Sequence, residues 1–226
     1  MKELITSSEM FGIFLSLATY TFGLWVKKKW NTPVANPLLI AIVLCVAVLA
    51  IFDIPYANFN AGGAAVTSLL VPATAVLGIS IYRELETLKK NFLPVMVGCI
   101  VGSIVSVVLS IVFCKLFGLD DQLVATMIPR AATSPIAMEV AENLGGLVPV
   151  TVAVVVFSGI VGAVAAPIFI SVMKWRNRVA VGVAIGVSSS AAGTSKAIEI
   201  GEVEGAMSGL AMGITGLATV VIGLFL

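Results

Sequence analysis

The stretch DDQLVATMIPRAATSPIAMEVAENLGG, residues 120–146, is the most informative part of this chain about its fold. It lies between two long apolar runs, yet it contains an arginine, two glutamates and two prolines. A continuous membrane helix does not accommodate Pro129, Arg130 and Pro135 together, because proline interrupts the helix and a charge is costly in hydrocarbon. A solvated loop has no need of so many Ala, Met, Val and Ile residues. The stretch is typical of a broken helical segment that enters a membrane and presents polar groups there.

The composition of the whole chain supports a membrane location. Of its 226 residues, 59% are hydrophobic and 11% are charged, whereas soluble domains have about 45–50% apolar and about 25% charged residues. Several uncharged runs exceed the roughly 18 residues that indicate a membrane span. We therefore expect an all-α polytopic membrane protein with a single transmembrane domain over residues 1–226.

Basic residues predict how the chain crosses the membrane. Most of the thirteen lie in three clusters: Lys27 to Lys29, Arg83 with Lys89 and Lys90, and Lys174 with Arg176 and Arg178. The positive-inside rule places all three clusters in the cytoplasm. Residues 120–146 then enter and leave from the outer face, with a tip at 129–135. Residues 179–202 enter and leave from the cytoplasmic face, with a tip at 188–194.

The predicted fold thus has about six full spans plus two interrupted or re-entrant helical hairpins. The spans are expected at 10–26, 37–52, 62–82, 92–117, 147–173 and 205–226. The third is expected to be kinked near Val71 and Pro72. The alternative is eight crossings in which 120–146 and 179–202 are broken but full spans. In either case two interrupted segments meet near the membrane centre, which is typical of a transport site.

The candidate binding residues lie at the two tips. In the first, Arg130 offers a planar fork of donors that suits a carboxylate. Ser134, with Thr133 before it and Pro135 after it, is expected to cap a helix whose N-terminus attracts anions. In the second, Thr194 and Ser195 are expected to begin a helix in the same way. Its candidate site residues are Ser190, Thr194, Ser195 and Lys196.

Structural roles compete with each of these assignments. Arg130 could form a structural pair with Glu139 or Glu142, or lie in an outer loop. The hydroxyl groups could serve as helix caps alone. Glu139 and Glu142 lie three residues apart and could couple protons, or they could form a solvated face.

Other chemistry is not indicated. The chain has no histidine, so the usual general base and most zinc sites are missing. We expect no enzyme activity, no cofactor, no metal site and no nucleic-acid partner. Cys45, Cys99 and Cys114 lie in apolar runs, where we expect packing rather than a disulfide.

Two helix faces carry small residues at every fourth position. One is Gly98, Gly102, Ser106 and Ser110, and the other is Gly205, Gly209 and Gly213. Such faces let helix backbones approach closely. They predict either packing within one chain or the seam of a homodimer.

Three blocks of sequence resemble one family, the LrgB/CidB family. They are LLVPATAVLGISIYRELETLKKN at 69–91, PRAATSPIAMEVAENLGGLVPVTVAVVVFSGIVGA at 129–163 and AAGTSKAIEIGEVEGAMSGLAMGITG at 191–216. The resemblance implies a multi-pass protein of the bacterial inner membrane, described as antiholin-like, that acts with a small holin-like LrgA/CidA partner. It also implies short monocarboxylates as substrates, because related systems look like pyruvate transporters and a plastid glycolate/glycerate translocator.

The chain departs from that family pattern at several positions. Val71 precedes Pro72 where the family has glycine, and Arg130 stands where a lysine is frequent. Ser190 occupies the position of a histidine and Ala192 that of an isoleucine. The missing histidine puts a proton-coupled step through that position in doubt.

Two functions follow as expectations. In the first, the chain is a secondary transporter or facilitator of small monocarboxylates of the pyruvate, glycolate or glycerate type. Its two broken segments then act as gates on either side of an anion site. In the second, it is an antiholin-like regulator of cell lysis and murein hydrolase activity that moves no solute. In both cases we expect contacts with lipid and a homodimer.

Overall fold

The computed structural model describes residues 6, 8–30, 36–69, 72, 75, 79 and 82–226, and these residues form helices connected by turns, with no strand among them. The chain divides into two compact units, Met1–Val76 and Leu77–Leu226. The single transmembrane domain that we expected over 1–226 stays a prediction.

In the described part of the first unit, three helices form a bundle. They are α2 (Glu9–Trp30), α3 (Pro37–Ile51) and α4 (Tyr56–Ser68). Helices α2 and α4 touch backbone to backbone at Gly12 and Gly62, where neither position has room for a Cβ atom. Helices α2 and α3 meet at Thr19, whose Oγ1 lies 3.2 Å from Sγ of Cys45. The kink that we predicted near Val71 lies outside the described residues.

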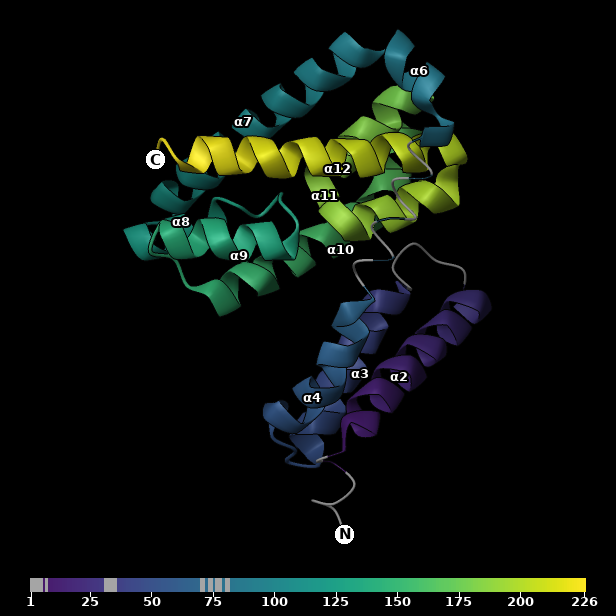
Figure 1. Ribbon diagram of the computed structural model, residues 1–226, viewed down its shortest axis with the longest axis vertical. Coiled ribbons are helices and arrows are strands. Elements are labelled where there is room, and N and C mark those ends of the chain that lie inside the picture. Colours follow the sequence, from purple (N-terminus) through teal and green to yellow (C-terminus); the bar gives the residue numbers. More distant parts are fainter. Residues whose placement is uncertain are drawn as a thin grey trace. The chain divides into compact units, whose positions relative to one another are not determined.

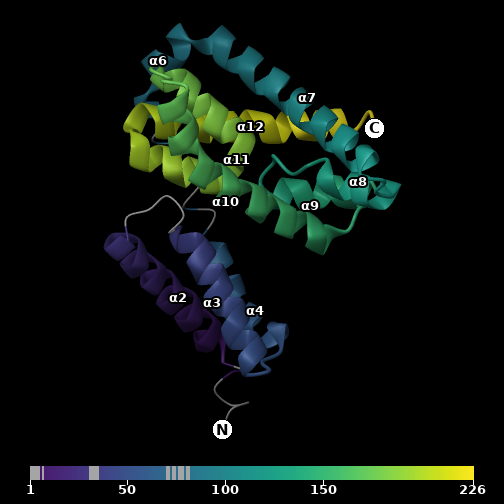
Figure 2. The same cartoon turned by 180° about the vertical axis from the view of Figure 1, so that it is seen from behind.

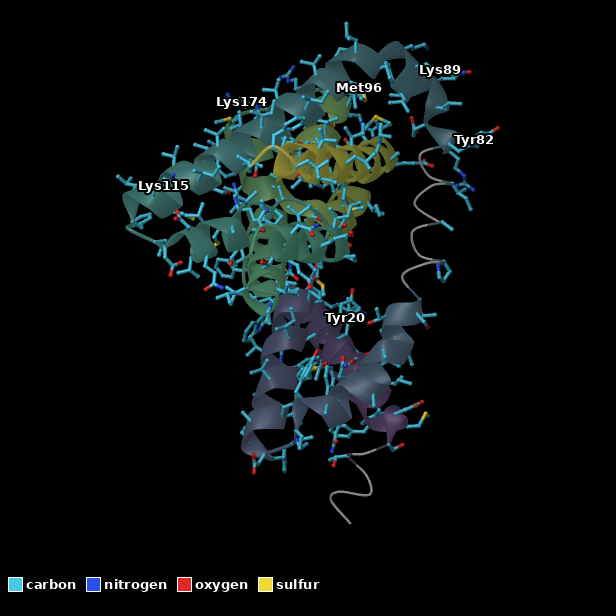
Figure 3. All side chains as sticks on the ribbon, turned by 60° about the vertical axis from the view of Figure 1, so that its left-hand side comes forward. Tyr20, Tyr82, Lys89, Met96, Lys115 and Lys174 are labelled. Carbon is cyan, nitrogen blue, oxygen red and sulfur yellow. The ribbon has the colours of Figure 1, made fainter. Side chains whose placement is uncertain are left out.

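The described residues of the second unit include seven helices, which are labelled in Figure 1. They are α6 (Leu85–Lys90), α7 (Phe92–Leu116), α8 (Asp121–Met127), α9 (Ser134–Asn143), α10 (Val148–Val172), α11 (Arg178–Ile200) and α12 (Glu202–Gly223). Lys89 and Lys115 lie at opposite ends of the α6–α7 segment (Figure 3).

The described helices include four that are long and apolar enough to cross a membrane. These are α2, α7, α10 and α12, and α3 is a shorter apolar helix. Bulky apolar side chains cover their outer faces, for example Leu93 of α7, 72% exposed, and Leu217 of α12, 68% exposed. An exposed apolar surface of this extent suits lipid rather than water. The prediction of an all-α polytopic membrane protein is confirmed.

Residues 120–146 form a short helical hairpin. Helices α8 and α9 have 7 and 10 residues, about 10 and 15 Å at 1.5 Å per residue, so neither could cross a bilayer core of about 30 Å. The Asp120 carboxylate caps α8 by accepting a bond from the Leu123 N–H. After α9 the chain returns to α8, where the Leu147 N–H donates a hydrogen bond to Oγ1 of Thr126 at 2.8 Å.

Helix α11 is also a hairpin. At Ser190 the backbone has φ 46° and ψ −137°, which ends one helical arm (178–189) and starts another (191–200). Val181 and Ala197 belong to one apolar cluster, although sixteen residues of continuous helix would separate them by about 24 Å. The chain therefore reverses direction at Ser190, within the tip that we predicted at 188–194.

The two hairpins enter from opposite ends of the unit. The α8–α9 hairpin packs near the C-terminal ends of α7 and α12, where Cys114 and Ile222 share a cluster with Val124. The base of the α11 hairpin packs near the N-terminal ends of the same helices, beside Val95 and Val203. This arrangement favours the re-entrant form of our topology over eight crossings.

The α11 hairpin is held between α7, α10 and α12 through small residues. A Cβ atom at Gly102 of α7 would lie 2.6 Å from a methyl group of Val187, and one at Gly162 of α10 would overlap the side chain of Ser189. On the α12 side, Gly186 lies against the backbone of Ser208. The first predicted small-residue face thus packs within the chain.

Candidate functional site

A cavity of about 520 Å³ lies between α10 and the first arm of the α11 hairpin. Figure 2 shows α10 extending from beside α9 to α11. On α10 the cavity is lined by Phe157, Ser158, Val161, Gly162, Ala165, Ala166, Phe169 and Ile170, and on the first arm by Val181, Ala184, Ile185, Ser188 and Ser189. Arg130 and Trp175 complete it. The spacing of each set places it on one helix face.

Helix direction gives the cavity a polar end and an apolar end. Ser188 and Ser189 lie at the tip of the hairpin, and Ser158 lies near the middle of α10. Ile170, Trp175 and Val181 lie toward the loop that joins the two helices. Hydroxyl groups therefore gather at the inner end beside Arg130, and hydrocarbon lines the rest.

Arg130 is fixed by contacts with two helices. Its Nε donates to Oγ of Ser110 on α7 at 2.9 Å, and its carbonyl oxygen accepts from Oγ of Ser158 on α10 at 3.2 Å. The next residues, Ala131 and Ala132, are buried. The first tip is therefore anchored deep within the unit, about ten residues along α10.

No carboxylate neutralises Arg130 in the described part of the chain. The ion pairs found there join other residues, and Glu139 and Glu142 are exposed on α9. The structural pair that we considered for Arg130 is therefore not formed. Arg130, which is part of the cavity lining, thus carries a charge without a counter-ion among the described residues, which is costly inside a membrane unless water or an anion compensates it.

The helix start at the first tip differs from our prediction by one residue. Thr133, not Ser134, is the N-cap residue of α9, and neither side chain caps a backbone N–H group there. Pro135 is still in the first turn, where its missing N–H costs nothing. Thr133 and Ser134 are half-buried and do not line the cavity.

The helix start at the second tip also differs. The second arm begins after Ser190, so Thr194 and Ser195 lie inside it rather than at its start. Thr194 Oγ1 donates to the Ser190 carbonyl oxygen at 2.9 Å and lies 3.0 Å from Oγ of Ser208. Its role in this structure is to join the tip to α12.

Ser195 and Lys196 do not line the cavity. Ser195 is exposed and donates to the Ala191 carbonyl oxygen. The Lys196 ammonium pairs with Glu199 at 2.8 Å, one helical turn away. Of the predicted binding residues, only Arg130 lines the cavity. The serines that line it beside Arg130 are Ser188 and Ser189, and the predicted Ser190 is not part of the lining.

Three lining serines were not among the predicted binding residues. Ser188 and Ser189 precede Ser190 in the predicted break, but the turn geometry that selects them cannot be read from a run of serines. Ser158 carried a usable signal, because it is a polar residue next to Gly159 in the middle of an apolar run. Polar residues inside membrane segments tend to face the protein interior or a cavity.

Together these features define a class of protein. It is a multi-pass helical membrane protein in which two re-entrant hairpins from opposite ends meet beside a cavity, the arrangement from which solute sites in membranes are built. The chain belongs to the LrgB-like family, whose family model matches residues 16–226.

Relatives match over nearly the whole length. The chain is 35% identical over 218 residues to antiholin-like protein LrgB of Bacillus subtilis (strain 168), which covers 96% of this chain and 94% of that protein. It is 33% identical to the proteins of the same name from Bacillus mycoides (strain KBAB4) and Bacillus cereus (strain B4264), over 96% of this chain and 95% of each relative. No solved structure matches the chain.

Proposed function

We propose that this protein is an antiholin-like regulator of cell lysis that acts with a small holin-like membrane subunit. The observation that supports this function is the similarity to relatives named antiholin-like protein LrgB over 96% of the chain. Of our two expectations, this alternative is the one that the relatives favour.

The test is co-expression with a holin-like membrane subunit in bacteria. We expect the two proteins to copurify after crosslinking and the chain to delay lysis caused by the subunit. Gly182→Leu, which would push α11 away from the Glu204 backbone, should abolish both effects, and Gly63→Ala, where a Cβ atom would lie 3.8 Å from the Asn60 side chain, should retain them. Absence of copurification and of any delay would contradict an antiholin-like role.

A second candidate function rests on the unpaired charge of Arg130. It is the transport or facilitated passage of small monocarboxylates. Nε of Arg130 is engaged by Ser110, and no hydrogen bond or ion pair of the two terminal nitrogens is found in the described part of the chain. A carboxylate can accept hydrogen bonds from such nitrogens, and the nearby serine hydroxyls can donate to it as well.

Movement of the hairpins would give access to this site. The two tips meet at the inner end of the cavity, where Arg130 of the α8–α9 tip and Ser188 and Ser189 of the α11 tip are among the lining residues. Withdrawal of either tip would expose Arg130 to one side of the membrane at a time, which is the essential feature of alternating access.

Uptake by proteoliposomes tests the transport function. We expect saturable entry of labelled pyruvate, glycolate or glycerate, reduced at least about tenfold by Arg130→Gln, because a charged hydrogen bond contributes roughly 1.5–3 kcal/mol. Arg130→Lys should retain part of the uptake. The matched control is Lys115→Gln, which removes a cation at the end of α7. Uptake equal to that of empty vesicles for every acid would refute transport.

A further inference from the structure

Three buried hydroxyl groups have no hydrogen-bond partner among the described residues. They belong to Ser106 of α7, Ser190 at the turn of the α11 hairpin and Thr215 of α12. These residues are only 9%, 4% and 0% exposed. Nearly all buried hydroxyl groups in proteins are paired, because an unpaired one has lost its hydrogen bonds with water and gained none in return. Such groups indicate a bound water molecule or a ligand.

The face of α7 that carries Ser106 follows the first arm of the α11 hairpin. A Cβ atom at Gly98 would lie 3.6 Å from Val183, and one at Gly102 would lie 2.6 Å from Val187. The two helices therefore run in the same direction and advance together. One further turn of α7, about 6 Å, reaches Ser106. Three residues beyond Val187 the arm ends at the turn of the hairpin, so Ser106 lies beside that turn.

Thr215 lies at the same level on α12. A Cβ atom at Gly182 of the first arm would lie 2.8 Å from Cβ of Met207, and one at Gly186 would lie 2.9 Å from Cβ of Ala211. Here too the two helices advance together by one turn. The next turn reaches Thr215 on α12 and the turn of the hairpin on α11. The three hydroxyl groups thus come from three elements at one level, which we call the hydroxyl junction.

The α8–α9 tip approaches this level from the other end. Nε of Arg130 donates to Oγ of Ser110 at 2.9 Å, one turn beyond the junction on α7. On α12, a Cβ atom at Gly216 would lie 2.7 Å from Cδ1 of Ile136, which is in the first turn of α9. The hydroxyl junction therefore lies between the tips of the two hairpins, with α7 and α12 beside it.

The charge beside the hydroxyl junction is positive. The side chain of Arg130 extends to α7, and its two terminal nitrogens have no hydrogen bond within the described part of the chain. Helix α9 begins here without a side-chain cap, so the positive end of its dipole adds to this charge. The described carboxylates of the neighbouring elements do not compensate it, since Glu204 pairs with Arg178 and both Glu139 and Glu142 are exposed. The surroundings thus favour an anion over a cation.

We propose that the hydroxyl junction binds the carboxylate group of the transported acid. The carboxylate accepts hydrogen bonds from the terminal nitrogens of Arg130 and from the hydroxyl groups of Ser106, Ser190 and Thr215. This inference rests on the transport function proposed above. It places the bound carboxylate between α7 and α12 rather than in the open groove between α10 and α11, and it adds Ser106 and Thr215 to the binding residues.

Two pairs of variants test this assignment in the uptake assay with labelled pyruvate, glycolate and glycerate. Thr215→Val removes an unpaired hydroxyl group and keeps the shape of the side chain. Its matched control is Thr219→Val, because Thr219 is also buried on α12 but its hydroxyl group already donates to the Thr215 carbonyl oxygen. Ser106→Ala is compared in the same way with Ser103→Ala, whose hydroxyl group donates to the Cys99 carbonyl oxygen.

The variants should separate binding from folding. Thr215→Val and Ser106→Ala should each raise KM by at least about tenfold, because each removes a hydrogen bond to a charged group. Thr219→Val and Ser103→Ala should leave KM unchanged. Without acid, Thr215→Val should unfold at or above the Tm of the unaltered protein, since the hydroxyl group that it removes has no partner. Added acid should raise the Tm of Thr215→Val less than that of Thr219→Val.

The outcomes separate the inference from the function on which it rests. If Arg130→Gln impairs uptake while Thr215→Val and Ser106→Ala leave KM unchanged, the hydroxyl groups hold ordered water only. The inference is then refuted and the transport function stands. If Thr215→Val lowers Tm without acid, or if the control variants raise KM equally, the hydroxyl groups serve packing and the inference is refuted. If no acid enters with the unaltered protein, both proposals fail.

Discussion

Replacement of Gly186 by alanine would test the packing of the α11 hairpin. Gly186 lies in the first arm, and a Cβ atom there would overlap the carbonyl oxygen of Ser208 and lie 2.9 Å from Cβ of Ala211. Neither obstacle can rotate away, since one is backbone and the other is a methyl group on Cα. The first arm and α12 must therefore move apart.

The expected loss of stability follows from two opposing effects. Overpacking a well-packed site costs about 1–3 kcal/mol, and a backbone obstacle places Gly186→Ala near the upper value. Alanine is better than glycine inside a helix by about 0.5–1 kcal/mol. The net loss is about 2 kcal/mol, which corresponds to a decrease in Tm of about 4–8 °C for a chain of this length.

Cysteine exposure measures this change. Cys99 of α7 is fully buried in the cluster that includes Val183 and Met207, so a thiol-reactive dye reports its exposure on unfolding. A Cys45→Ala background removes the half-buried thiol of the first unit. The matched control is Gly213→Ala in α12, where a Cβ atom meets no other atom within 4 Å.

Gly213→Ala should raise Tm by about 1–4 °C, because it gains helix preference without a clash. The two variants should therefore shift Tm in opposite directions, although both replace glycine with alanine. If Gly186→Ala unfolds at or above the temperature of Gly213→Ala, the close contact between the α11 hairpin and α12 is wrong.

Three further predictions concern the hairpins. Arg178 and Glu204 form two hydrogen bonds of 2.9 Å that close the base of the α11 hairpin. Arg178→Glu should therefore lower Tm, and the added change Glu204→Arg should restore much of the loss. An unchanged Tm in the single variant would contradict this role. Ser190→Gly should raise Tm by about 2–8 °C, because it relieves a positive φ worth roughly 1–2 kcal/mol, and a decrease would show that this turn is wrong. Single cysteines at Asn143 and Arg176, on a background without native cysteines, should label only from outside and only from the cytoplasm respectively, and labelling of both from one side would refute the topology.

Much of the architecture could be predicted because it depends on local composition. The costs of placing charge and of interrupting a helix in hydrocarbon are properties of a short window of sequence. Pro129, Arg130 and Pro135 fall in one such window, and the serine run at 188–190 falls in another. Both interrupted segments were therefore visible before any tertiary structure.

The predicted helix starts were less accurate, because N-cap preference is also a local property and neighbouring residues can share it. Ser and Thr are good N-cap residues wherever they occur, so adjacent candidates compete. Thr133 and Ser134 are neighbours with similar preferences, and Ser188 to Ser190 are identical. The turn at Ser190 is selected by packing around it, since Gly162 of α10 leaves room for Ser189 and Ser208 of α12 lies against Thr194.

Local composition is enough to show that this is a helical membrane protein, which two segments are broken, and that Arg130 is the prominent charge at a break. Which hydroxyl groups accompany that charge depends on the packing of the helices, which brings Ser158, Ser188 and Ser189 to the cavity and pairs Lys196 with Glu199. The free energy of transferring a segment into a membrane depends mainly on that segment's own composition. The lining of a cavity depends on the rotation and depth of helices that pack against partners far away in the chain.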